Sequence, residues 1–130
     1  MHIVAIVCTA ILGLLLFALG LAVSILRGKY KTLIGQPNDP THLLQKIVRA
    51  HGNTAEYAPF LAVLFLYLGN RGPSLWVLWA IGITTAARVA IVVGLLTCNT
   101  LSRPHPVRFL GALGTYLGGI ALCVAMVTGA

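Results

Sequence analysis

Four long apolar stretches constrain the fold of this chain more than any other feature. They lie at about 1–26, 43–68, 74–97 and 107–128. Each is near or above the roughly 20 residues that an α-helix needs to cross a bilayer. Because a backbone in lipid must satisfy its own hydrogen bonds, we expect all four stretches to be helices. The sequence therefore predicts an all-α integral membrane protein, a bundle of four transmembrane helices that forms one domain over residues 1–130.

The composition supports lipid as the solvent of this chain. Hydrophobic residues make up 58% of the sequence and charged residues only 8%, whereas a soluble domain carries roughly 25% charged residues. The net charge is +7, but the basic residues form no dense run interleaved with aromatics, so nucleic-acid binding is not indicated. The first stretch lacks a positive n-region and is too long for the apolar region of a signal peptide. We therefore expect it to be retained as a span.

The distribution of the basic residues predicts an orientation. The connections after the first and third stretches hold most of the Lys and Arg, so the positive-inside rule places these two connections in the cytoplasm and both ends outside. Aromatic residues flank the short second connection, as expected at the outer interface. They are Tyr67, Trp76 and Trp79.

Polar residues form a stripe on the second apolar stretch. Arg49, Asn53 and Glu56 have the spacing i, i+4 and i+7, which is typical of one helical face. Lys46 and His42 extend this face towards the cytoplasmic end. Such a stripe cannot face lipid cheaply. We expect it to line a bundle interior, a subunit interface or a water-filled pocket.

Arg88 lies among apolar residues of the third stretch. An unpaired charge there costs at least about 2.5–3.5 kcal/mol on insertion scales. Glu56 is the only nearby acid that the sequence offers. We therefore predict that Arg88 and Glu56 pair, within a chain or across a subunit interface. The alternative is that this pair only joins two helices and has no role in binding.

Cations are in surplus at the cytoplasmic end. They are Arg27, Lys46, Arg49, Arg103 and Arg108. Anionic lipid headgroups account for exposed members of such a set. However, Arg49 and Arg108 lie within or at the start of apolar stretches, so a bound small anion is a hypothesis for them. An arginine can fork onto a carboxylate, and a nearby cation lowers a thiol pKa.

The remaining patterns indicate packing and exclude several kinds of site. Cys8, Cys98 and Cys123 form no CxxC pair and lie near no metal-like histidine spacing, so no metal site is predicted and all three are expected as small buried residues. Gly114-x-x-x-Gly118 predicts close approach of two helices. A transporter or proton relay is disfavoured because only Glu56 is a deep acid and nothing continues its path outward.

The segment "RAHGNTAEYAPFLAVLFL" resembles the second-helix signature of the MAPEG superfamily, the membrane-associated proteins in eicosanoid and glutathione metabolism. That signature is Arg-x-x-x-Asn-x-x-Glu followed by an aromatic residue and a proline, and here it is matched by Arg49, Asn53, Glu56, Tyr57 and Pro59. "ARVAIVVGL" and "HPVRFLG" resemble the third helix of bacterial members and the start of their fourth.

This resemblance implies a homotrimer, in a bacterial inner membrane, that binds glutathione as co-substrate between subunits on the cytoplasmic side. Hydrophobic small molecules or lipids are the implied acceptors, and the implied activity is that of a glutathione transferase or peroxidase in detoxification. Arg108 matches an arginine near the sulfur in catalytic members and is the implied catalytic residue. The resemblance implies that Arg49, Asn53 and Glu56 hold glutathione, and Arg27 loosely matches a basic first-helix residue that reaches one of its carboxylates. Lys46 and Arg88 complete the predicted binding set, and Glu56 accepts either from the glutathione amine or from Arg88.

The chain departs from catalytic members of the superfamily at two positions on the third helix. Ile91 and Leu95 stand where such members commonly carry His or Tyr. The thiol would then be activated by Arg108 alone or by the nearby His105, and Tyr116 is a poor substitute for the missing tyrosine. The alternative function is a non-catalytic membrane scaffold of the same fold that binds a lipid or a partner protein.

Overall fold

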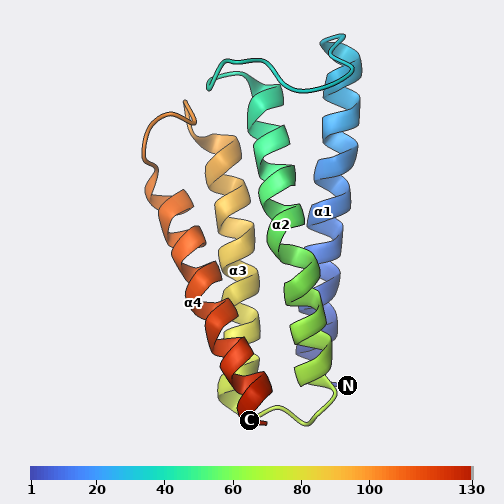
Figure 1. Ribbon diagram of the computed structural model, residues 1–130, viewed down its shortest axis with the longest axis vertical. Helices are drawn as coiled ribbons and strands as arrows, with labels where there is room; N and C mark the ends of the chain where they lie inside the picture. Colours follow the sequence, from blue (N-terminus) through green and yellow to red (C-terminus); the bar gives the residue numbers. More distant parts are fainter. Residues whose placement is uncertain (130) are drawn as a thin grey trace.

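The computed structural model describes residues 1–129, and these form an antiparallel bundle of long helices (Figure 1). The helices are α1 (Ile3–Lys29), α2 (Leu43–Gly69), α3 (Leu75–Thr97) and α4 (Pro106–Thr128). No strand occurs within the described residues. The four helices expected from the apolar stretches are thus confirmed, with ends that differ from the expectation by only a few residues.

Three of the four helices are long and apolar enough to cross a membrane, namely α1, α3 and α4. The chain is therefore an integral membrane protein. α2 is as long as α1, at 27 residues, but it does not qualify by composition. It carries Lys46, Arg49 and Glu56, and these charged side chains lower its hydropathy.

Two histidines cap helices at their N-termini. His2 precedes α1, and its Nδ1 accepts a hydrogen bond of 3.2 Å from the backbone N–H of Val4. His42 precedes α2 and accepts from the N–H of Leu44 at 3.1 Å. Such caps satisfy backbone donors that the first helical turn leaves free. His42 therefore caps α2 and does not extend the polar stripe along the helix.

The connections α1–α2 and α3–α4 lie at the same end of the bundle, opposite the two chain ends (Figure 1). They are tied together by a hydrogen bond of 2.9 Å from the N–H of Leu101 to the carbonyl oxygen of Pro40. Beside this contact, Asp39 accepts bonds from the hydroxyl of Thr41 at 2.7 Å and from its N–H at 2.9 Å. These two bonds hold the pKa of the Asp39 carboxyl below its ordinary value.

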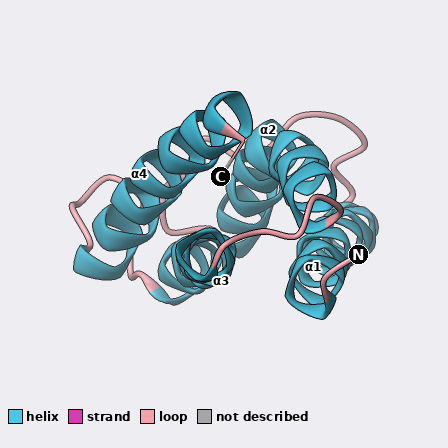
Figure 2. Ribbon diagram, turned by 90° about the horizontal axis from the view of Figure 1, so that it is seen from below, coloured by secondary structure: helices cyan, strands magenta, loops and turns pink. Residues whose placement is uncertain are grey.

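The four helices do not close into a square bundle. α1 packs mainly on α2, and α4 packs mainly on α3, while α2 and α3 join the two pairs. Within residues 1–129, α1 and α4 make no contact with each other, and Figure 2 shows them on opposite sides of the molecule. One side of α2 is consequently left uncovered in a single chain.

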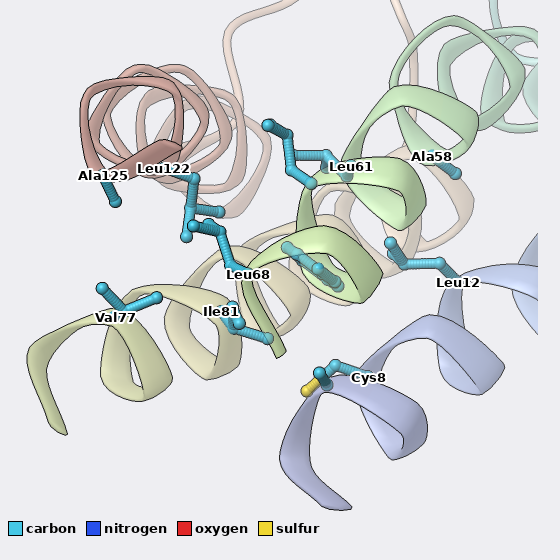
Figure 3. Close-up of a cluster of buried hydrophobic side chains, with 12 residues drawn as sticks. Cys8, Leu12, Ala58, Leu61, Leu68, Val77, Ile81, Leu122 and Ala125 are labelled. Atoms are coloured by element: carbon cyan, nitrogen blue, oxygen red, sulfur yellow. The ribbon is translucent and has the colours of Figure 1, made fainter. Parts of the chain in front are cut away.

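Two apolar clusters form the interior. The larger one fills the half of the bundle near the chain ends and takes side chains from all four helices, including Leu12, Leu61, Ile81 and Leu122 (Figure 3). The smaller one lies towards the connections and contains Leu19, Ala50, Ile91, Val92 and Leu95. Between the two clusters, α2 and α3 carry buried polar side chains.

Glycines on α4 allow it to approach α3 closely. A Cβ atom on Gly111 would lie 2.7 Å from the backbone nitrogen of Ile91 and 2.9 Å from the carbonyl oxygen of Ala87. One turn further along α4, a Cβ on Gly114 would lie 2.8 Å from the side chain of Ala87. After another turn, a Cβ on Gly118 would collide with the side chain of Thr84. The close approach predicted from Gly114-x-x-x-Gly118 is confirmed, and Gly111 extends it by one turn.

Gly111→Ala should lower the free energy of unfolding by about 1–3 kcal/mol, because the new methyl group meets backbone atoms of α3 that cannot move aside. The matched control is Gly13→Ala on α1, where an added Cβ meets nothing within 4 Å. This control should be neutral or slightly stabilising, since alanine favours helix. Unfolding in a mixed-micelle SDS titration measures both variants, and equal effects would contradict the close α3–α4 contact.

The three cysteines differ in environment. Cys8 and Cys98 are buried as expected, but Cys123 is exposed. The expectation was wrong for Cys123 because it lies on the side of α4 that no helix of the same chain covers. All three are free thiols.

Candidate functional site

Arg88 of α3 is the largest side chain that the protein buries completely, with only 1% of its surface exposed. Its Nη2 donates to both oxygens of Asn53 on α2, at 2.7 Å to the side-chain Oδ1 and at 3.0 Å to the backbone carbonyl. The guanidinium carbon also lies 5.1 Å from the centre of the Tyr57 ring. One amide and one aromatic face thus surround a buried cation between the two apolar clusters.

The expected ion pair between Glu56 and Arg88 is not formed within the chain. Glu56 Oε1 lies 3.6 Å from Nη1 of Arg49 on its own helix, and these two side chains are 53% and 54% exposed. Depth in the membrane pointed to Glu56 as the nearest acid for Arg88. In the structure, Asn53 is the residue of the stripe that faces α3. Both of its oxygens accept from Nη2 of Arg88.

The polar stripe of α2 therefore divides into two parts. Asn53 turns inwards and is buried, whereas Arg49 and Glu56 lie on the uncovered side of the helix. A charged pair on that side would face acyl chains if the chain were alone in a membrane. Such groups almost always face a protein interior or a wet cavity, so this side of α2 is the candidate site.

A groove of about 820 Å³ runs between α2 and α4 and begins beside the charged pair. Glu56 and Tyr57 line it from α2, and Tyr116 lines it from α4. The rings of Tyr57 and Tyr116 are 5.9 Å apart. Nearly all other lining residues are apolar, including Phe60 and Val124 from the two helices. The groove offers a polar end next to Glu56 and an oily remainder.

The other candidate residues lie apart from this pair in a single chain. Arg27 at the end of α1 donates through Nη2 to the carbonyl oxygen of Gly35 at 3.1 Å, and its Nε is buried without an acceptor among the described residues. Lys46 is half-buried in the first turns of α2. Within residues 1–129, no hydrogen bond or ion pair joins Arg27 or Lys46 to Arg49 or Glu56.

Arg108, the implied catalytic residue, is half-buried in the first turn of α4. Its Nη1 donates to the carbonyl oxygens of Leu101 and Arg103, at 3.2 and 3.3 Å, in the connection before the helix. Its aliphatic part lies against Gly94 of α3. One chain therefore holds Arg108 at the connection end of the α3–α4 pair and does not bring it to the Arg49–Glu56 pair.

The two departures from the catalytic pattern lie in the core. Ile91 and Leu95 are buried and pack in the smaller apolar cluster beside Leu19 and Ala50. They supply no group that could take or give a proton. The described residues also contain no cluster of three or more His, Cys, Asp or Glu side chains that could hold a metal ion.

Tyr57 and Tyr116 belong to the site although the sequence pattern gives them little weight. Tyr57 lies off the polar stripe, but it stands four residues after Asn53 and so shares the face of α2 that meets Arg88. That i, i+4 spacing was the available signal. Tyr116 has no comparable signal, since only the packing of α4 beside α2 brings its ring to Tyr57.

The fold and the candidate site together describe a helical membrane protein that carries a charged pair on the uncovered side of α2. The MAPEG family model matches residues 5–128, nearly the whole chain. The chain belongs to the MAPEG family, whose members are membrane proteins of eicosanoid and glutathione metabolism and include glutathione transferases. No curated protein and no solved structure gave a significant match.

Proposed function

We propose that the protein binds glutathione and transfers it to hydrophobic electrophiles, or uses it to reduce hydroperoxides, in the membrane. The observation that carries this proposal is the half-exposed Arg49–Glu56 pair on the uncovered side of α2. Glutathione has two carboxylates and an amine, so an arginine and a glutamate side by side complement its charged ends. Family membership agrees with this ligand class.

In the proposed assembly, α2 is the fourth span of a single domain over residues 1–130, and three copies form a homotrimer. A neighbouring subunit covers the charged side of α2, which removes the cost of exposing Arg49 and Glu56 to lipid. Arg27 supports a ligand between subunits, since its buried Nε lacks an acceptor among the described residues. Lys46 supplies a further cation, while Asn53 and Arg88 hold α2 in place from within.

Arg108 is the proposed catalytic residue. In the trimer, a guanidinium near the sulfur of glutathione would stabilise the thiolate, which then attacks the electrophile. The proposed location is a bacterial inner membrane with the site on the cytoplasmic side, and the basic connections support this orientation.

Arg49→Ala should weaken glutathione binding at least about tenfold, because a charge-assisted bond to a carboxylate is lost. Isothermal titration of the purified, assembled protein measures this directly. Arg49→Lys should give an intermediate loss of affinity, since lysine keeps the charge but cannot bind a carboxylate through two parallel hydrogen bonds. The control is Arg71→Ala, which removes an exposed cation that stacks on Tyr67 at the other end of the bundle. Absence of wild-type binding up to millimolar glutathione would refute the proposal.

The second candidate function is a non-catalytic scaffold that binds a lipid. The α2–α4 groove favours it, because this groove is almost wholly apolar and ends at Glu56 and two tyrosines. The apolar character of Ile91 and Leu95 favours it as well. This candidate predicts an intact assembly that retains acyl chains during purification. Turnover of glutathione with any electrophile or hydroperoxide would exclude it.

A further inference from the structure

The connection between α1 and α2 carries two apolar side chains that are almost fully exposed. Leu33 is 94% exposed and Ile34 is 87% exposed. Most other exposed large apolar side chains of the described residues lie on the helices, where lipid covers them. Leu33 and Ile34 lie outside the helices, and the proposed glutathione site does not use them. Their exposure therefore needs another explanation.

The chain turns sharply directly after α1. The N–H of Thr32 donates to the carbonyl oxygen of Arg27 at 3.0 Å, and the N–H of Lys31 donates to that of Gly28 at 3.3 Å. Lys31 lies between these bonds with a φ of 52°. Two such bonds around a left-handed residue form a Schellman motif, which ends a helix. The segment after Lys31 consequently leaves the direction of the helix axis.

Arg27 also holds the far end of this segment. Its Nη2 donates to the carbonyl oxygen of Gly35 at 3.1 Å, and Gly35 has a φ of 74°, which glycine adopts without strain. Residues 32–35 thus form a short loop that is closed on Arg27 at both ends, and we call it the apolar tip. Arg27 belongs to the last turn of α1 and is the first charged residue of that helix. The apolar tip therefore lies at the depth where α1 meets the membrane–water boundary.

Cations flank the apolar tip. Lys29 and Lys31 are exposed, and neither forms an ion pair among residues 1–129. Asp39, the only acid of this connection, accepts two bonds from Thr41. Exposed apolar side chains beside lysines suit a leaflet with anionic lipids, because the lysines attract the headgroups while the apolar groups enter below them.

We propose that the apolar tip inserts into the leaflet on its own side of the membrane. Leu33 and Ile34 lie among the upper acyl chains, and Lys29 and Lys31 contact anionic headgroups. Burying either apolar side chain favours the inserted state by about tenfold or more. Each lysine contributes roughly a further fivefold where the lipids are anionic. This anchor is independent of glutathione binding.

The test places an environment-sensitive fluorophore on the apolar tip of the assembled protein. The label is attached to Leu33→Cys in a Cys123→Ser background, since Cys123 is the exposed native thiol. Asn38→Cys in the same background is the matched control, because Asn38 is exposed in the same connection but outside the closed loop. The nanodiscs contain phosphatidylcholine with or without phosphatidylglycerol. The quenchers are a lipid with a nitroxide on its upper acyl chain and aqueous iodide.

We expect the lipid nitroxide to quench the label at position 33 strongly and the label at position 38 weakly. Ile34→Ser should lower the ratio of inserted to free tip about tenfold. Phosphatidylglycerol should strengthen the quenching at position 33, and Lys29→Gln/Lys31→Gln should remove this increase while leaving the quenching in phosphatidylcholine.

Three results would overturn the anchor. Quenching at position 33 by iodide alone would show that the tip stays in water. Protection from both quenchers would show that another copy of the chain covers it. Equal quenching at positions 33 and 38 would show that the label and not the tip enters the lipid. If phosphatidylglycerol has no effect, the contact of the lysines with anionic headgroups is refuted.

Discussion

Asn53→Leu should lower the free energy of unfolding by about 3 kcal/mol, one of the largest losses available to a single substitution in this chain. The leucine keeps the volume of the side chain but removes the acceptor at 2.7 Å from Arg88. The guanidinium, which is 1% exposed, is then left as a buried cation with less compensation. Removing one partner of a buried charge is costly for this reason.

Arg88→Leu should cost less than Asn53→Leu, because it removes the buried charge itself and leaves only a neutral amide without its partner. The double variant Asn53→Leu/Arg88→Leu should be more stable than Asn53→Leu alone, since replacing both partners by apolar groups can be nearly neutral. Mixed-micelle unfolding measures all three. Asn70→Leu, at the exposed end of α2, is the control for the Asn-to-Leu change.

Additive losses in this cycle would contradict a direct Asn53–Arg88 interaction. A much larger loss for Arg88→Leu than for Asn53→Leu would show that the aliphatic part of Arg88, and not its charge, matters for stability. The asymmetry between the two single variants therefore separates pairing from packing.

Arg108→Ala should lower kcat for conjugation of a chlorinated aromatic about a hundredfold or more, if the proposed transferase activity is correct. Losses of this size follow when a group that stabilises developing negative charge is removed. Glutathione binding by the same variant should change only a few-fold, because the arginine acts on the thiolate. Arg108→Lys should recover part of kcat, since a cation returns near the sulfur.

The structural contacts of Arg108 with the carbonyl oxygens of Leu101 and Arg103 need their own measurement. The thermal midpoint of Arg108→Ala reports how much those contacts stabilise the connection. If kcat and binding fall equally and in step with the midpoint, Arg108 holds the connection and has no role at the sulfur. A wild-type protein without any activity would favour the lipid-binding scaffold instead.

Much of the fold could be predicted because lipid leaves the chain few options. The apolar stretches at 1–26, 43–68, 74–97 and 107–128 became α1 to α4 nearly residue for residue. The turn-forming residues of the connections could only end helices. The mutual arrangement could not be predicted in the same way. Gly114 and Gly118 indicated a close contact, but only the structure shows that its partner is α3 and that α1 and α4 stay apart.

The sequence predicts which residues form the polar stripe on α2, but not which groups each of them contacts. At about 100° per residue, Arg49 and Glu56 differ by only about 20° around the helix, so they lie on one side and can pair. Asn53 is rotated by about 60° from Glu56, which is enough to turn it towards α3. Spacing alone predicts one face for all three, and charge matching then predicts Glu56 as the partner of Arg88, a pair that does not form within the chain. The amide and carbonyl oxygens of Asn53 accept from Nη2 of the guanidinium without any acid, while its Nε has no partner among the described residues.

The uncovered charged pair on α2 also bears on how the protein is made in the cell. If copies assemble as proposed above, a newly inserted copy would hold Arg49 and Glu56 against acyl chains until a neighbour covers them. Quality-control proteases recognise such unfinished surfaces, so unassembled copies should be degraded quickly. The steady-state amount of the protein would then report the rate at which copies find each other and not the rate of synthesis.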